Sequence, residues 1–305
     1  MIRFILRRLA VSIPVIFLVA TTTFFIMRLA PGGPFMSERA IPPEILANLQ
    51  AKYGLDQPLW VQYGRYLHSL LLLDLGPSYK YPERTVNQII AEGFPVSLQL
   101  GLAALCVALL VGIPGGVLSA VKHRTVIDRL TMSVILVGIS VPTFVLGPLL
   151  VFVFSLTLYW FPPALWGSAQ QLVLPAITLG TPYSVYIARL TRAQMVDVLQ
   201  QDYIRTARAK GVGPLRILYK HARNATLLPV VSYLGPAVAD LVTGSIVVEK
   251  IFAIPGLGRY FVESAFSRDY TTVLGTVLFY AVLLIFANMV VDVLYRFLDP
   301  RIEYR

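Results

Sequence analysis

Residues 130–188 read LTMSVILVGISVPTFVLGPLLVFVFSLTLYWFPPALWGSAQQLVLPAITLGTPYSVYIA and contain no charged side chain. A helix rises about 1.5 Å per residue and the hydrocarbon core of a membrane is about 30 Å thick, so this run must cross the core and return. Residues 160–167 (WFPPALWG) mark the return, because prolines end helices and tryptophans favour the membrane interface. The stretch therefore predicts a hairpin of two membrane spans.

Four more charge-poor runs are long enough to cross a membrane, at residues 9–27, 93–121, about 226–248 and 270–291. The first has no small-residue cleavage site at its end, so we expect an uncleaved span rather than a signal peptide. Only 14% of the chain is charged and its mean hydropathy is +0.70, whereas a soluble domain has about 25% charged residues. The sequence predicts an all-α polytopic membrane protein with six transmembrane helices.

Lys and Arg are concentrated on one side of the predicted membrane. The chain has 26 Lys and Arg against 16 Asp and Glu, and 17 of the 26 lie in segments on the same side as the N-terminus. Cytoplasmic segments carry the excess of Lys and Arg, so we expect both termini in the cytoplasm. The net charge of +10 thus reflects topology and does not indicate a nucleic-acid partner.

Several kinds of chemical site are not expected from the sequence. No GxxxxGK[ST] loop occurs and Gly-Lys appears nowhere, so we expect neither a Walker A site nor enzymatic activity of this chain by itself. The chain has one cysteine, Cys106, and its three histidines form no HExxH pair. We therefore expect no disulfide and no metal site.

The predicted extracytoplasmic loop, residues 29–92, is long enough to have structure of its own. Pro43 and Gly54 are placed as the start and end of a short helix. Leucines between residues 67 and 72 suggest a second, amphipathic piece on the membrane surface. The loop either caps the spans or docks an extracytoplasmic partner. The expected organisation is residues 1–28 with the first span, the loop at 29–92, and a core of five spans at 93–305.

The predicted cytoplasmic segment, residues 189–225, contains two short helices that meet at a bend. Residues 202–210 (DYIRTARAK) favour a helix, Gly211 follows as its stop, and Pro214 restarts a helix. Topology requires positive charge but not such a bend, so we expect this segment to pass motion from a cytosolic partner into the spans. The alternative is that its basic residues only set topology and contact lipid headgroups.

Residues 205–211 (RTARAKG) resemble the EAA loop of ABC importer permeases, in the form found in peptide transporters. The general motif has glutamate in place of Arg205 and proline in place of Asn224, and the peptide branch shares both departures. Further matches to this family are MRLAPG (27–32), KYGLDQP (52–58), DLGPS (74–78), IPGLG (254–258), RDY (268–270), VDVLY (291–295) and DPR (299–301). The chain is similar to the first permease subunit of an oligopeptide or dipeptide importer. Residues 33–35 (GPF) and 41–44 (IPPE) lean toward the oligopeptide branch.

The resemblance implies the type I ABC importer permease fold in a bacterial cytoplasmic membrane, in contact with lipid. In that family the permease forms a heterodimer with a second, similar permease. Two cytosolic subunits bind ATP and Mg²⁺, and an extracytoplasmic binding protein delivers the peptide. The residues implied in coupling to the ATPase are Ile204, Arg205, Ala207, Arg208, Gly211, Pro214, Leu215 and Leu218. Whether the apolar ones contact the ATPase or pack beneath it stays open.

Asp240 is an acid near the middle of a predicted span, and such a residue must face protein or water. It either binds the ammonium group of a peptide or bonds to a neighbouring helix or subunit. Pro142 and Gly244 are further pathway candidates because they loosen their helices, although small residues also serve close packing. The candidates for docking the binding protein are Glu249, Arg259, Glu263 and Arg268, with surface solvation as the alternative.

Other functions remain as alternatives. Dipeptides, nickel chelates or glutathione are alternative substrates within the same family. A stand-alone secondary transporter would show an internal repeat and paired charges in several spans, whereas only Asp240 lies clearly inside one and no repeat is evident. A membrane-embedded enzyme would need paired catalytic side chains in the spans, and the sequence shows no such pair.

Overall fold

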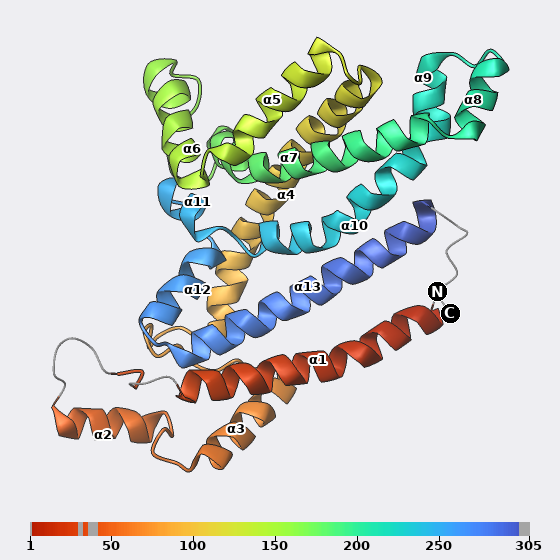
Figure 1. Cartoon of the computed structure of the whole chain (residues 1–305). Coiled ribbons are helices and arrows are strands. Elements are labelled where there is room, and N and C mark those ends of the chain that lie inside the picture. The colour runs from red at the N-terminus through yellow and green to blue at the C-terminus, as the bar shows by residue number, and fades with distance from the viewer. Residues whose placement is uncertain (1, 30–32, 36–41, 299–305) are drawn as a thin grey trace. The chain divides into compact units, whose positions relative to one another are not determined.

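The computed structural model describes residues 2–29, 33–35 and 42–298. Three stretches that resemble the permease family extend outside them: residues 30–32 of MRLAPG, residue 41 of IPPE and all of DPR (299–301). Apart from one isolated bridge between Pro77 and Thr85, the regular elements of the described residues are all helices (Figure 1). The chain divides into two compact units.

The first unit consists of Met1–Pro95 and Gly256–Val282. Its helices are α1 (Ile2–Leu29), α2 (Pro43–Lys52), α3 (Leu59–Leu71), the start of α4 (Val86–Val121), α12 (Leu257–Phe266) and the start of α13 (Tyr270–Leu298). Both predicted helices of the outer loop are present. As expected, α2 begins at Pro43, and Gly54 follows its end with a φ of +64°.

The second unit consists of Val96–Pro255 and Leu283–Arg305. After the larger part of α4 come α5 (Val126–Ser140), α6 (Thr143–Leu150), η1 (Val151–Thr157), α7 (Ala169–Leu199), α8 (Asp202–Ala209), α9 (Pro214–Arg216), η2 (Ile217–Ala222), α10 (Arg223–Val242) and α11 (Ile246–Ile251). The predicted break at residues 160–167 is confirmed, because η1 ends before it and α7 begins after it.

The first arm of the predicted hairpin, which the sequence predicted as one span loosened at Pro142, is broken into two helices. Helices α5 and α6 meet at Pro142, and the segments on either side are bent by 104°. Val141, just before the proline, is extended with φ −97° and ψ 114°. Proline disfavours helical backbone in the residue before it, which accounts for the break.

The predicted span at 226–248 falls within one candidate span, Pro214–Ile251, whose helix is locally irregular. Helix α10 ends at Val242, Gly244 has a φ of +88°, and Ser245 caps α11 by accepting a hydrogen bond from Val248 N–H. Asp240 therefore lies near the end of α10 and inside this candidate span, as the sequence predicted. Within the described residues, four helices are long and apolar enough to cross a membrane, or five if the bent pair is one span. The count of six spans and the side of the termini stay predictions.

Small residues of α4 form the centre of the second unit. Ala104 and Ala108 are completely buried, each in an apolar cluster with residues of α7 and α10. A Cβ atom added at Gly101 would lie 2.6 Å from the carbonyl oxygen of Leu241 on α10. Small side chains let helix backbones approach closely in membranes, so this face of α4 determines how α7 and α10 pack.

Candidate functional site

The predicted bend is present in the second unit as the α8–α9 turn, residues 202–219. Gly211 has a φ of +77°; its N–H donates to Arg208 O, and Val212 N–H donates to Ala207 O. These two bonds end α8 and require a residue in the left-handed conformation, which glycine adopts without strain. Pro214 starts the next helix as predicted. That helix is not short, however, because η2 continues it into α10.

The inner face of the α8–α9 turn packs on α4 and α7. Ile204 is fully buried and Ala207 is 7% exposed, in a cluster that includes Ala120 of α4 and Met195 of α7. Leu218 is half-buried against the same cluster. In this chain Ile204 and Ala207 therefore pack beneath the surface, and Leu218 does so in part.

The outer face of the α8–α9 turn exposes apolar and basic side chains. Leu215 is 79% exposed and Tyr219 is 76% exposed. Arg205 and Arg208 are exposed on α8. A pocket of about 320 Å³ lies beside them, lined by Val121, Leu199, Arg208, Val212, Pro214, Ile217 and Leu218. Exposed apolar side chains rimmed by cations suit a protein partner with apolar and acidic groups.

A buried ion pair ties α5 to α7 next to this cluster. Asp128 is 4% exposed, and Arg192 donates to its two carboxylate oxygens from Nε and Nη2, each at 2.9 Å. The Ser119 hydroxyl on α4 and the Arg124 N–H also donate to Asp128. Sequence reasoning missed this network because Asp128 and Arg192 are 64 positions apart. Their charges had been used only to assign the cytoplasmic side of the membrane.

Asp240 lies on the exposed side of α10 and accepts a hydrogen bond from the Tyr183 hydroxyl of α7. On the same two helices, Tyr186 stacks on Tyr233 with ring centroids 4.3 Å apart. The structure thus bonds one predicted residue to Tyr183 and places a stacked pair of tyrosines on the same two helices. Sequence reasoning missed all three tyrosines. Because Tyr183 and Tyr186 precede Asp240 by more than fifty positions, no local pattern links them.

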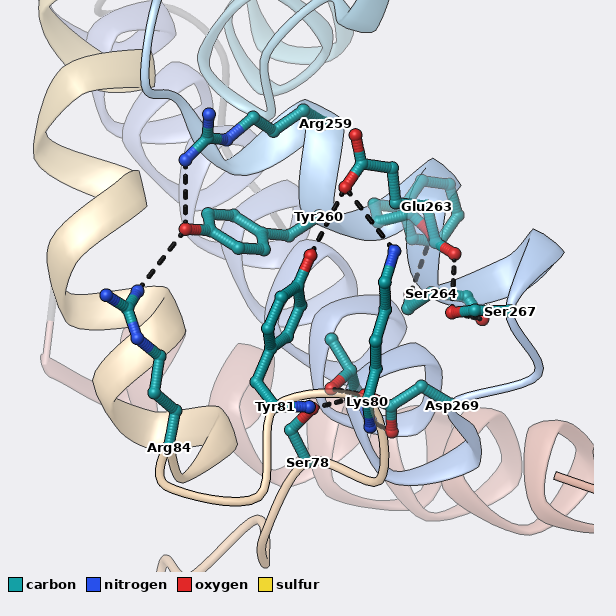
Figure 2. Close-up of polar contacts among 12 residues, drawn as sticks. Ser78, Lys80, Tyr81, Arg84, Arg259, Tyr260, Glu263, Ser264, Ser267 and Asp269 are labelled. Carbon is teal, nitrogen blue, oxygen red and sulfur yellow. Dashed lines mark hydrogen bonds and ion pairs between the residues drawn. The ribbon is translucent and has the colours of Figure 1, made fainter. Parts of the chain in front are cut away.

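Figure 2 shows a polar cluster around α12 in the first unit. Glu263 accepts a hydrogen bond from the Tyr81 hydroxyl at 3.3 Å and pairs with Lys80 Nζ at 3.7 Å. Arg259 Nη2 donates to the Tyr260 hydroxyl at 3.0 Å. Two predicted docking residues, Arg259 and Glu263, therefore lie on one helix, and Glu263 is bonded to the loop before α4.

The other two predicted docking residues differ from each other in exposure. Arg268 is exposed just after α12, with a φ of +57°. Glu249, in the second unit, is 1% exposed, and its carboxylate accepts a hydrogen bond from the Ser97 hydroxyl at 2.8 Å. This burial argues against Glu249 as a docking residue.

Asp269 holds the loop before α4 to the start of α13. It is 1% exposed. Its Oδ1 accepts from Tyr79 N–H at 3.1 Å, and its Oδ2 accepts from Lys80 N–H at 3.3 Å and from the hydroxyls of Ser78 and Thr272. Burial raises the pKa of the Tyr79 hydroxyl beside it. Asp269 belongs to the stretch RDY (268–270), which resembles the permease family. The residues next to it in the sequence did not predict these contacts.

Replacing Asp269 with Asn should destabilise the first unit by about 2 kcal/mol, because the new NH₂ group would face the Lys80 N–H donor. Thermal unfolding of the purified protein and proteolysis of the loop at residues 77–85 would measure the effect. Asp74→Asn is the matched control, since Asp74 is exposed and accepts a local bond from Gly76 N–H. Equal stability of the two variants would contradict the role of Asp269.

Two family models match the chain. The model described as "Binding-protein-dependent transport system inner membrane component" matches residues 112–304. The model described as "Binding-prot-dependent transport system membrane comp, N-term" matches residues 1–101. Together they cover nearly the whole chain.

Relatives of similar length and one solved structure agree with these matches. The oligopeptide transport system permease protein OppB of Salmonella typhimurium is 47% identical over 306 residues, covering 100% of both chains. The dipeptide transport system permease protein DppB of Bacillus subtilis is 46% identical, covering 99% of this chain and 98% of its own. A chain of the inward-facing MetNI methionine ABC transporter aligns with a TM-score of 0.56 and 20% identity, covering 70% of this chain and 97% of its own. The expected ABC importer permease fold is confirmed.

Proposed function

The chain belongs to the family of binding-protein-dependent transport system inner membrane components, and on this premise we propose that it forms the peptide pathway of an ATP-driven importer. The observation that carries the proposal is 47% identity over the full length of an oligopeptide permease. The match includes the outer loop as well as the core, so it supports a shared class of cargo and not only a shared fold. Dipeptides are the second candidate, because a dipeptide permease is 46% identical.

Peptide uptake in the native host tests this function. A strain that lacks the gene should regain uptake of radiolabelled tri- to pentapeptides when the chain is restored together with its partner subunits. A dipeptide is measured in parallel and should be taken up more slowly. Failure to import any peptide, with every subunit present in the membrane, would overturn the proposal.

The partners that we propose are a second, similar permease, an extracytoplasmic binding protein and two cytosolic ATPases that hold ATP and Mg²⁺. The exposed Leu215 and Tyr219 support docking of an ATPase on the α8–α9 turn. The buried Ile204 and Ala207 join α8 to both α4 and α7. A push on the turn would therefore move two helices together as a rigid body.

The binding protein is proposed to dock on the outer surface of the first unit. Arg259, Glu263 and Arg268 supply charges of both signs there. The many bonds of Asp269 hold the neighbouring loop in place, so this surface is formed before a partner arrives. A preorganised surface loses less entropy when it binds.

The exposed side of α7 and α10 around Asp240 is proposed to line the peptide path. An acid that faced lipid there would be costly, so the carboxylate must meet water, peptide or the second permease. Replacing Asp240 with Asn keeps an acceptor for Tyr183 but removes the charge. We expect the KM for peptide uptake to rise about tenfold, through loss of a charge-assisted contact to the peptide ammonium group.

Transport assays on Asp240→Asn need a control for loss of charge alone. Asp197→Asn removes an exposed acid from α7, outside the patch of Tyr183, Tyr186 and Tyr233. That variant should transport peptide with an unchanged KM. Wild-type uptake by Asp240→Asn would exclude the ligand role.

A further inference from the structure

An apolar groove of about 990 Å³ lies within the first unit. Its walls are formed by α1, α3, α4 and α13, with Phe17, Leu70, Phe94 and Leu278 among the lining residues. The volume is at the upper end of the range of about 300 to 1,000 Å³ that ligand pockets span. The groove is therefore large enough for an elongated apolar ligand.

The groove has almost no polar chemistry to offer a ligand. Among the described residues that line it, Asn87 has the one polar side chain. Its Nδ2 donates to Leu73 O at 2.7 Å and its Oδ1 accepts from Leu75 N–H at 2.9 Å. With this amide already engaged, a peptide or sugar in the groove would leave its own polar groups unpaired. A hydrocarbon chain has no polar groups to leave unpaired, so the groove suits it.

The groove is formed mainly by helices that could span a membrane. Three of its walls, α1, α4 and α13, are helices long and apolar enough to span a bilayer. The fourth wall, α3, runs beside α1, where the Tyr63 and Thr21 hydroxyls are 2.7 Å apart and the Phe24 and Tyr66 rings stack with centroids 5.4 Å apart. Apolar helices of this length would be surrounded by lipid, and the groove opens among them.

Exposed leucines continue the apolar surface beyond the groove. Leu71, Leu72 and Leu73, at the end of α3, are 84%, 68% and 81% exposed. Leu71 and Leu73 also line the groove. Three consecutive leucines this exposed are stable in hydrocarbon and not in water, which extends the contact with lipid from the groove to the tip of α3.

We propose that this groove is a binding site for the acyl chains of a membrane phospholipid, which joins α3 to α1 and α13. An empty groove of this size would leave its lining without contacts on one side and weaken the packing of these helices. The bound lipid acts as part of the first unit and exchanges more slowly than lipid in the surrounding bilayer. The site serves the fold of the subunit, whatever its cargo.

Photocrosslinking from two positions on α1 tests the proposal. Ile16 lines the groove, whereas Leu18 is 64% exposed and does not line it. Residues two apart point to different faces of a helix. A benzoylphenylalanine at each position is activated in the complete transporter, purified in detergent from membranes of phosphatidylethanolamine and phosphatidylglycerol. Intact-mass measurement should show a phospholipid adduct at position 16 at least about ten times more often than at position 18.

Two outcomes would overturn the lipid site. A crosslink from position 16 to another subunit would show that a protein segment fills the groove. Equal lipid adducts at both positions would show only bulk lipid. A filling variant gives an independent measurement, since Ile16→Trp should remove the phospholipid that co-purifies with the complex while Leu18→Trp retains it. Retention of this lipid by a folded Ile16→Trp complex would also contradict the proposal.

Discussion

Replacing Leu215 with Asp should reduce peptide uptake at least about a hundredfold, while the chain inserts and folds normally. Leu215 is 79% exposed in the first turn after the Gly211 bend, so the substitution leaves no cavity in the chain itself. In the docking that we propose, the new carboxylate would be buried in an apolar contact with the ATPase. An unpaired charge in such a contact is strongly unfavourable. Uptake by whole cells and recovery of the ATPases with the permease would measure the effect.

Alanine variants of two leucines separate docking from packing. Leu215→Ala should weaken association with the ATPase without changing the thermal unfolding midpoint of the permease. Leu218→Ala should lower that midpoint, because Leu218 packs on the cluster around Ile204. If Leu215→Asp retained its ATPases through purification and transported at the wild-type rate, the α8–α9 turn would not be the docking site.

The end of α8 could be predicted from sequence because its signals are local. Gly211 and Pro214 act on the backbone within two or three residues, and the structure places the helix stop and restart where they were expected. Which side chains of the turn are buried could not be predicted in the same way. The burial of Ile204 depends on Ala120 and Met195, which come from other helices.

The long charge-free runs predicted the locations of helices better than their continuity. Hydropathy averages over a whole run, whereas a break depends on one or two residues, such as Pro142. Pro142 had been singled out as loosening its helix, but hydropathy alone could not distinguish a loosened helix from two helices. The burial of Glu249 was missed for a different reason, because its partner Ser97 lies 152 positions away.

Close approach of α4 and α7 explains the second large effect that we expect. Replacing Gly116 with Ala should destabilise the second unit by about 3 kcal/mol. The added Cβ would lie 2.6 Å from Thr191 Cβ and 3.1 Å from Arg192 N on α7. Neither atom can move without shifting the helix backbone. Arg192 is also held by its ion pair with Asp128, so α7 has little freedom to retreat.

The neighbouring Gly115 provides a matched control for the Gly116 variant. A Cβ added at Gly115 would meet Ile135 Cδ1, the end of a flexible side chain that can turn away. Gly115→Ala should therefore be neutral or gain up to about 1 kcal/mol, since alanine favours a helix more than glycine does. Thermal unfolding in detergent and the yield of folded protein compare the two variants. If Gly116→Ala proved as stable as Gly115→Ala, the packing of α4 on α7 would have to be looser than the structure shows. The small face of α4 would then not determine how these helices pack.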